Sequence, residues 1–296
     1  MLLTPFNSLD TPMNTLLYYL VVICRHTPGF RGKWRLEAWL EQNKEKYAAL
    51  GPVTYRVKGH AYRVHPQTNF HLYMYGPKKN EKIVPLMERY AQPGGVAIDV
   101  GAHSGYFTLC LSDAVGANGK VYAFEASPVI YAELRETIDS NGLGNILAFN
   151  NAVSDKSEQT DFYLAPNWKS EISSMRHGEG KRISIEAVAL DDVIPDSQPV
   201  SFVKIDVEGA EMKVLKGMEA IIQRDAPVMV IEISDSWLKE LGSSSAEVFD
   251  FLFRHGYEIY EIHKQDCIKV TLPPQKQIDA LCIPGKKGFT KPSQHV

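Results

Sequence analysis

Apolar runs separated by amphipathic stretches dominate the pattern along the middle of this chain. Short, apolar, strand-like runs occur at residues 96–100, 121–124, 146–153, 202–206 and 228–233. Apolar residues at helical spacing predict helices at residues 106–114, 128–140 and 210–222. Strands that alternate with helices in this way are typical of βαβ units, so the pattern predicts an α/β fold with a mostly parallel sheet.

The alternation of strands and helices is interrupted once, at residues 155–190, and resumes after it. Residues 155–190 hold short β-like runs around a polar stretch at 166–182, which carries Trp168, Arg176 and His177. This stretch is either a lid over an acceptor or a plain surface excursion. Later elements are a helix at 243–255 and strands at 257–263 and 279–283, predicted as an antiparallel pair.

The N-terminal third follows a different rhythm. Helices are predicted at 31–50 and 81–90, and a β-hairpin at 53–64 around Lys58-Gly59. The Pro93-Gly94-Gly95 turn is the predicted boundary between an N-terminal extension, residues 1–92, and one domain over 93–285. Residues 286–296 read as a polar tail.

Charge and cysteine usage bear on two questions, whether the chain binds nucleic acid and in which redox compartment it works. A net charge of −3 over 296 residues argues against a broad electrostatic grip on nucleic acid. The four cysteines form no C-x-x-C pair, so they are expected to be buried free thiols. A reducing cytoplasm is the location that fits such cysteines.

Residues 16–24, LLYYLVVIC, are the one segment whose apolar run suggests contact with a membrane. The run falls short of the ~20 apolar residues needed to span a bilayer. Basic and aromatic residues follow it, so residues 16–35 could rest peripherally on the inner face of a membrane. The alternative is a buried helix or a homo-oligomer contact, and the pattern favours that alternative.

The sequence VAIDVGAHSGYF, residues 96–107, carries the most chemistry. A strand ends at Asp99, a turn holds Gly101 and Gly105, and a helix opens at Tyr106. Ligands of open α/β sheets bind at this carboxyl edge, where glycines allow close backbone approach and a helix start can hold an anion.

Glu125 ends the next strand, VYAFE, twenty residues after Gly105. An acid at that place can accept both ribose hydroxyls of a nucleoside cofactor. A dinucleotide fingerprint starting at Gly101 would need glycines where His103 and Tyr106 stand. The spacing therefore disfavours a pyrophosphate cofactor and suits a nucleoside without one.

These residues resemble a known family. DVGAHSGYF, AFEASP, NNAVSD, LDDV and above all VKIDVEGAEMKVLKG are similar to the FkbM-type methyltransferases, over roughly residues 93–235. The resemblance implies the class I, Rossmann-like methyltransferase fold, with a seven-stranded sheet whose last strand is antiparallel. It also implies S-adenosyl-L-methionine as cofactor and methyl transfer, usually to oxygen, on sugars or natural products.

The resemblance extends the expected cofactor site around the glycine loop and the second strand. The candidates are Asp99, Gly101, Ala102, His103, Gly105, Tyr106, Glu125, Ala126, Asn151 and Ala152. The family often has Asn where this chain has His103, which puts that polar contact in doubt. Asn151 is either an adenine contact or an ordinary turn residue.

Carboxylates at the next strand ends are the candidates for catalysis: Asp206, Glu208, Glu211 and Glu232. One of them could take the proton of an acceptor hydroxyl. Gathered carboxylates repel, so one must be protonated, paired with Lys204 or bound to a cation. Glu208 and Glu211 could instead simply favour the start of a helix. We expect no metal, although a divalent ion stays an alternative.

The predicted function is thus O-methylation of a sugar, glycan or natural-product hydroxyl with S-adenosyl-L-methionine. Two alternatives remain at this point, a nicotinamide-dependent oxidoreductase and a non-catalytic module that keeps the fold. The expected partner is a small-molecule or glycan acceptor and no nucleic acid.

Overall fold

The structure is a computed structural model that describes residues 19–20, 23–24, 33–42, 51–66, 68–77, 82–164, 175, 180–263 and 266–285. Most of residues 16–35, all of the tail at 286–296 and most of the polar stretch at 166–182 lie outside these residues, so their predicted roles stay predictions. Among the described residues, no helix combines the length and apolarity that a bilayer crossing requires.

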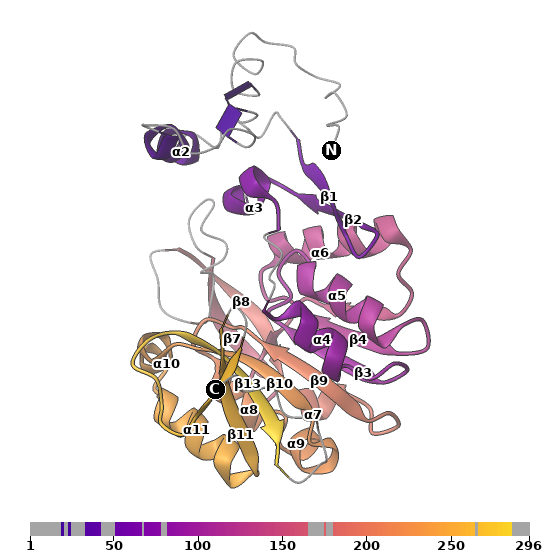
Figure 1. Ribbon diagram of the computed structural model, residues 1–296, viewed down its shortest axis with the longest axis vertical. Coiled ribbons are helices and arrows are strands. Elements are labelled where there is room, and N and C mark those ends of the chain that lie inside the picture. Colours follow the sequence, from indigo (N-terminus) through magenta and orange to yellow (C-terminus); the bar gives the residue numbers. More distant parts are fainter. Residues whose placement is uncertain are drawn as a thin grey trace.

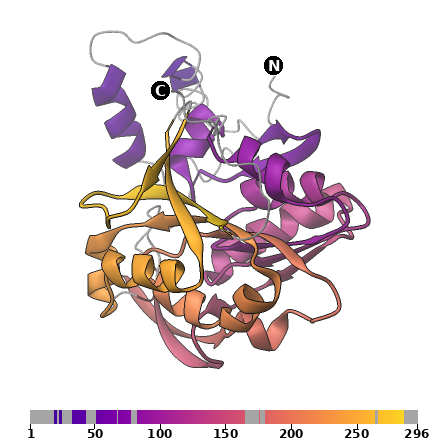
Figure 2. The ribbon, with the colours of Figure 1, turned by 60° about the horizontal axis from the view of Figure 1, so that its bottom comes forward.

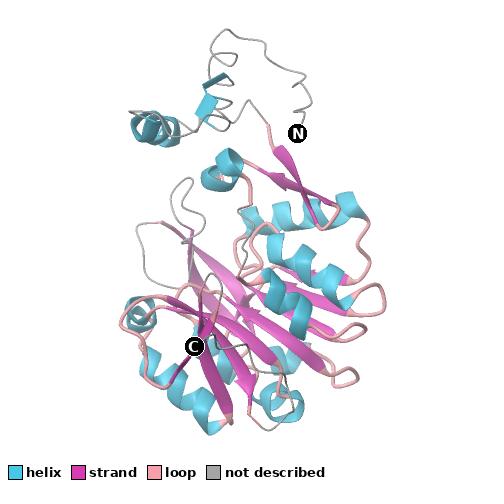
Figure 3. Cartoon of the chain, in the orientation of Figure 1, coloured by secondary structure: helices cyan, strands magenta, loops and turns pink. Residues whose placement is uncertain are grey.

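An eight-stranded sheet forms the middle of the molecule (Figures 1 and 3). From edge to edge its strands are β12 (Cys267–Val270), β11 (Tyr257–Ile262), β13 (Ile278–Pro284), β10 (Val228–Ile233), β9 (Val200–Ile205), β3 (Val96–Val100), β4 (Lys120–Phe124) and β5 (Ile146–Phe149). The strands from β10 to β5 are parallel, and β13 runs antiparallel to β10 and β11. This order is that of the class I methyltransferase fold, which confirms the predicted fold.

The predicted count of seven strands is wrong by one. The extra strand, β12, pairs only with the outer edge of β11. Only its first residue, Cys267, is buried, so β12 lacks the apolar run that marks the central strands.

Helices cover both faces of this sheet, and two apolar cores result. One face packs against α4 (Val84–Tyr90), α5 (Tyr106–Val115) and α6 (Pro128–Asn141). The other packs against α7 (Leu190–Val193), α8 (Glu211–Lys216), α9 (Glu219–Asp225), α10 (Asp235–Glu240) and α11 (Ser245–Arg254). Every residue of β3 is buried, because alternate side chains enter opposite cores.

The N-terminal segments are α2 (Lys33–Gln42), the hairpin of β1 (Val53–Val57) and β2 (His60–Val64), and α3 (Phe70–Tyr75). The hairpin packs against α5 and α6, whereas α2 lies apart from these helices (Figure 2). The hairpin confirms its prediction, with antiparallel register around Lys58-Gly59. Asn141 of α6 holds it in place, accepting from the Ala61 N–H and donating to the Ala61 carbonyl, each at 2.7 Å.

A small second sheet corrects the predicted strand at 146–153. That run splits into β5 and β6 (Ala152–Val153), and β6 joins β8 (Lys181–Val188) and β7 (Glu158–Leu164) in a three-stranded sheet. The chain turns between the two sheets at Asn150, whose amide donates to the Glu125 carbonyl at 2.8 Å. The apolar run continues through the turn, so periodicity alone does not reveal the break.

The single helix predicted over 210–222 is also two helices, α8 and α9. The chain breaks at Gly217, where any side chain would collide with the backbone carbonyl of Ser154. Asp191 then caps α9, accepting N–H groups from Ala220 at 2.9 Å and Ile221 at 3.0 Å. Both helices face the same core, so one apolar stripe spans the break.

Candidate active site

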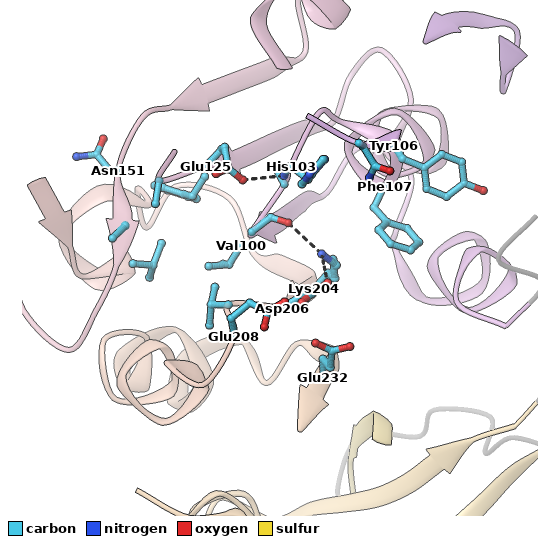
Figure 4. Close-up of a pocket in the computed structure, with 18 of the residues that line it drawn as sticks. Val100, His103, Tyr106, Phe107, Glu125, Asn151, Lys204, Asp206, Glu208 and Glu232 are labelled. Carbon is cyan, nitrogen blue, oxygen red and sulfur yellow. Dashed lines mark hydrogen bonds and ion pairs between the residues drawn. The ribbon is translucent and has the colours of Figure 1, made fainter. Parts of the chain in front are cut away.

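A cavity of 530 Å³ opens at the carboxyl ends of the parallel strands (Figure 4). Its size lies within the usual range for a small-molecule site. Most residues predicted for the site line it: Gly101, Ala102, His103, Tyr106, Glu125, Ala126, Asn151, Ala152, Asp206, Glu208 and Glu232. Three predicted residues, Asp99, Gly105 and Glu211, do not line it.

Glu125 stands directly after β4 and is held by the backbone around it. One carboxylate oxygen accepts the N–H of Ser127 at 2.8 Å, and the other accepts the N–H of His103 at 2.9 Å. Burial raises the pKa of Glu125 to about 7, against the opposing effect of these two N–H groups. Each oxygen keeps acceptor capacity, so the carboxylate can receive a diol.

The glycine loop is shaped by contacts within the protein. A side chain on Gly101 would collide with the Asp206 carbonyl, and a Cβ on Gly105 would lie 2.9 Å from Leu134. Both glycines have positive φ, 77° and 99°. Both glycines therefore make room for neighbouring protein atoms, and the prediction that they also leave room for the cofactor stays a prediction.

The backbone N–H groups of this loop are also used internally. Those of Gly101 and Ala102 donate to the Phe124 carbonyl at 3.0 and 2.9 Å. Gly105 is the N-cap of α5 and offers no side-chain acceptor to the helix start. An anion could therefore bind at the first turn of α5, beside Tyr106 and Phe107, which line the cavity.

Asp99 lies beneath the cavity rather than in its wall, which corrects its predicted contact with the cofactor. It is fully buried, accepts the Thr108 hydroxyl at 2.6 Å, and faces the Lys204 ammonium at 3.7 Å. Burial raises the pKa of Asp99, and the charge of Lys204 opposes that rise. Asp99 therefore acts on the site through Lys204.

Lys204 contacts both Asp99, which is buried below the cavity, and Asp206, which lines it. Its ammonium donates to the Gly101 carbonyl at 3.1 Å and lies 3.2 Å from Asp206. Burial works to lower the pKa of Lys204, but the carboxylates of Asp206 and Asp99 outweigh it and raise that pKa. The ammonium also sits 5.1 Å from the ring centre of Phe107.

Asp206 and Glu232 form a hydrogen-bonded carboxyl pair at the ends of β9 and β10. Burial works to raise the pKa of Asp206, but Lys204 and the bond from Glu232 lower it. Burial and the charge of Asp206 raise the pKa of Glu232 to about 9. Near neutral pH the pair therefore holds one proton, on Glu232, and Asp206 is the ionised member.

Glu208 completes a group of three carboxylates whose ligand atoms with Asp206 and Glu232 lie within 4.8 Å of one another. Figure 4 shows the three together, away from Glu125 and Asn151. Such spacing could admit a divalent cation. Lys204 and the shared proton already relieve much of the repulsion between these acids.

Glu211 turns away from the cavity and serves the turn before α8. Its carboxylate accepts the N–H of Gly209 at 2.9 Å, and burial raises its pKa to about 7. This corrects its place among the catalytic candidates.

Asn151 and His103, two of the residues predicted to bind the cofactor, are held by neighbouring protein groups. The amide of Asn151 donates to the carboxylate and carbonyl of Glu186, at 3.2 and 3.3 Å, so its N–H groups already have acceptors. Burial and Lys204 lower the pKa of His103 to about 4, which leaves its imidazole neutral near pH 7.

The cavity also has walls that the sequence did not reveal. They come from α3 and its N-cap, α5, β7, α10 and the loop before β13, and Met175 lies between β7 and β8: Asn69, Leu72, Phe107, Phe162, Met175, Trp237 and Gln277. Tyr62 and Pro77 add to them, so the N-terminal extension covers part of this edge. Gln277 donates to Glu232 at 2.6 Å. Phe107 belongs to the glycine-loop motif at 96–107, but the other residues follow no strand end or glycine loop, so no local signal marks them.

Comparison with known proteins places the chain in a family. The FkbM methyltransferase domain matches residues 99–259, more than half of the chain. The chain belongs to the FkbM methyltransferase family. It is an S-adenosyl-L-methionine-dependent methyltransferase, and the oxidoreductase and non-catalytic alternatives fall away. A second family, the protein-L-isoaspartate(D-aspartate) O-methyltransferases, matches residues 36–155.

Individual relatives are distant. The hexuronic acid methyltransferase AglP of Haloferax volcanii is 26% identical over 206 residues, 67% of this chain and 80% of that protein. Methyltransferase sdnD of Sordaria araneosa is 26% identical over 155 residues, 41% of this chain and 60% of that protein. The crystal structure of an FkbM methyltransferase from Methylobacillus flagellatus has a TM-score of 0.41 and 18% identity, covering 67% of this chain and 50% of its own.

Replacing the buried lysine tests the electrostatics of the site floor. Lys204→Met leaves the buried Asp99 without its cation, so we expect a loss of roughly 3–5 kcal/mol in the free energy of unfolding, measured with urea. Lys216→Met, on the exposed side of α8, should change it by less than about 0.5 kcal/mol. Adding Asp99→Asn to Lys204→Met should recover part of the loss. Equal stability of the wild type and Lys204→Met would contradict this account.

Proposed function

We propose that this methyltransferase transfers the methyl group of S-adenosyl-L-methionine to a hydroxyl of an uncharged sugar, glycan or related small molecule. The observation that carries the proposal is the separation of two polar groups in one cavity. Glu125 and the loop before α5 lie at one end, and the carboxylates of Asp206, Glu208 and Glu232 lie at the other.

The cofactor takes the first end in this proposal. The Glu125 carboxylate, oriented by two backbone N–H groups, accepts the ribose hydroxyls. The methionine carboxylate lies at the start of α5, and the adenine lies towards Ala126, Asn151 and Ala152. The sulfonium methyl then points towards Asp206.

The acceptor takes the second end. Its hydroxyl donates a hydrogen bond to the ionised Asp206, while Lys204 and Glu232 hold that carboxylate in place. The acceptor oxygen attacks the methyl carbon, the carbon–sulfur bond breaks, and the hydroxyl proton passes to Asp206 and on to water. Since Lys204 makes Asp206 a weak base, most of its effect is expected from orientation.

The charge of this end favours an uncharged acceptor. Among the described residues, the carboxyl groups of Asp206, Glu208 and the protonated Glu232 lie around it, with one ammonium, that of Lys204. An anionic acceptor would gain little from this group of acids, whereas a hydroxyl finds acceptors for its hydrogen. The relative AglP is named for a hexuronic acid acceptor, so an uncharged acceptor would set this chain apart from it.

The location that we propose is the cytoplasm. All four cysteines are buried free thiols, as the sequence predicted, and a reducing compartment suits them.

The affinity for S-adenosyl-L-methionine should depend on pH through Glu125. Its pKa of about 7 means that a growing share of the carboxyl is protonated as pH falls, and the ribose hydroxyls favour the ionised form. Below pH 7 the affinity should therefore fall with pH, with a slope that approaches about tenfold for each pH unit. Binding of the cofactor should release protons from Glu125. Calorimetric titration between pH 6 and 8 measures both. Glu125→Gln should bind more weakly and lose this part of the pH dependence. The same slope in both proteins would refute the assignment.

Asp206→Asn tests the acceptor end. The amide keeps the shape of the side chain but removes the charge that strengthens its hydrogen bond to the acceptor hydroxyl, so turnover should fall by about tenfold or more with cofactor affinity nearly unchanged. Turnover is measured by transfer of a labelled methyl group to sugar and small-molecule acceptors. Asp279→Asn is the matched control, because Asp279 pairs across the sheet with Glu232 without lining the cavity. Loss of cofactor binding in Asp206→Asn, with turnover per bound cofactor kept, would place Asp206 in the cofactor site instead.

A further inference from the structure

The loop between β3 and α5 contains a residue in an uncommon backbone conformation. His103 has a φ of 50°, in the left-handed region that residues other than glycine seldom adopt. Its backbone N–H donates to the Glu125 carboxylate at 2.9 Å (Figure 4). If this φ relaxed to a negative value while the start of α5 stayed fixed, the peptide before His103 would turn and carry that N–H away from Glu125. The contacts that hold His103 therefore also decide how Glu125 is held.

Those contacts pass through the next residue, Ser104. The Ser104 hydroxyl lies 3.0 Å from Nδ1 of the His103 imidazole and 2.6 Å from the hydroxyl of Tyr62. The backbone carbonyl of Ser104 accepts the Thr137 hydroxyl of α6 at 3.1 Å. Tyr62, Ser104 and Thr137 are each 1% exposed, so water competes little for these bonds. A buried chain of hydrogen bonds thus runs from Tyr62 through Ser104 to the His103 ring.

Tyr62 lies on β2 of the N-terminal hairpin, before the part of the chain that matches the FkbM domain. Helix α6 fixes its position relative to the loop. Asn141 of α6 bonds both backbone groups of Ala61, the neighbour of Tyr62, and Thr137, one turn earlier on α6, bonds Ser104. The hairpin and the loop are therefore held at a constant separation, which the Tyr62 hydroxyl bridges.

We infer that Tyr62 is a positioning residue for cofactor binding, which acts through Ser104 and His103 to keep the His103 N–H on the Glu125 carboxylate. The inference rests on the proposed function, because it takes Glu125 to receive the ribose hydroxyls. It gives the N-terminal hairpin a part in the cofactor site that is separate from its covering of the cavity edge.

A weaker bond from His103 would change the titration of Glu125. Burial, the largest influence, and the charge of Asp99 raise the pKa of Glu125. The N–H groups of Ser127 and His103 and the ammonium of Lys204 lower that pKa. Loosening only the His103 bond should therefore move the pKa of Glu125 above its value of about 7. The affinity for the cofactor should then fall near pH 7, where less of the carboxylate is ionised, and recover as pH rises.

The first measurement is the pKa of the Glu125 carboxyl, followed by carbon NMR in the full chain labelled at its glutamates, with Glu125→Gln to assign the signal. Tyr62→Phe removes the hydroxyl and keeps the ring, so that pKa should rise by about 0.5–1. Ser104→Ala removes both bonds of the loop hydroxyl and should raise it at least as much. Tyr55→Phe is the matched control, because its hydroxyl belongs to the same hairpin but bonds the Tyr73 carbonyl, so the pKa of Glu125 should not move.

The second measurement is the affinity for S-adenosylhomocysteine, by calorimetry between pH 6 and 8.5. In Tyr62→Phe it should be about two- to fivefold weaker than in the wild type at pH 7 and nearly equal at pH 8.5. A double variant tests the route. Glycine adopts a positive φ without strain, so in a His103→Gly background the added Tyr62→Phe should leave the pKa of Glu125 unchanged.

An unchanged pKa of Glu125 in either Tyr62→Phe or Ser104→Ala would overturn the inference, as would an equal rise in Tyr55→Phe. A rise of the same size in the His103→Gly background, or a loss of affinity that is the same at pH 7 and 8.5, would leave Tyr62 with a structural role only and so refute it. If the pKa of Glu125 rises as expected but S-adenosylhomocysteine binds Tyr62→Phe and Glu125→Gln as tightly as the wild type, the proposed place of the ribose fails and the hold of Tyr62 on Glu125 stands.

Discussion

The ammonium of Lys204 lies buried where β3 and β9 meet, and the geometry of the site depends on it. It neutralises Asp99 below the pocket, donates to the Gly101 carbonyl in the loop, and holds Asp206 ionised at the pocket surface. Burying any one of these charges without the others would be costly. One cation therefore ties the end of β3, the glycine loop and the end of β9 into a fixed arrangement.

In that arrangement, Glu125 and the pair of Asp206 and Glu232 lie in different surroundings along one edge of the sheet. Glu125 is bound by backbone N–H groups, and its pKa of about 7 is set mainly by burial. Asp206 and Glu232 instead share one proton, with the ionised member facing Lys204. A site with these two ends can bind a nucleoside diol at one and a hydroxyl acceptor at the other, which is what methyl transfer from S-adenosyl-L-methionine requires.

Sequence reasoning found the elements that are strongly periodic and locally punctuated. The runs at 96–100 and 228–233 are buried on both faces, and their bounds agree with β3 and β10. It could not find the break at Gly217, because the need for a glycine there comes from the carbonyl of Ser154, far away in the chain. Strand ends correctly located Glu125, Asp206 and Glu232, but which side of the edge Asp99 faces depends on packing. The walls from α3 and α10 come from short helices without a periodic pattern.

In the proposed function, one cofactor lies across this sheet edge in one direction. A crystal structure of the protein with S-adenosylhomocysteine tests that claim most directly. The account predicts the ribose hydroxyls on the Glu125 carboxylate, the amino-acid carboxylate at the start of α5, and the sulfur facing Asp206. A ribose placed on Asp206 or Glu232, or a cofactor bound outside this cavity, would contradict it.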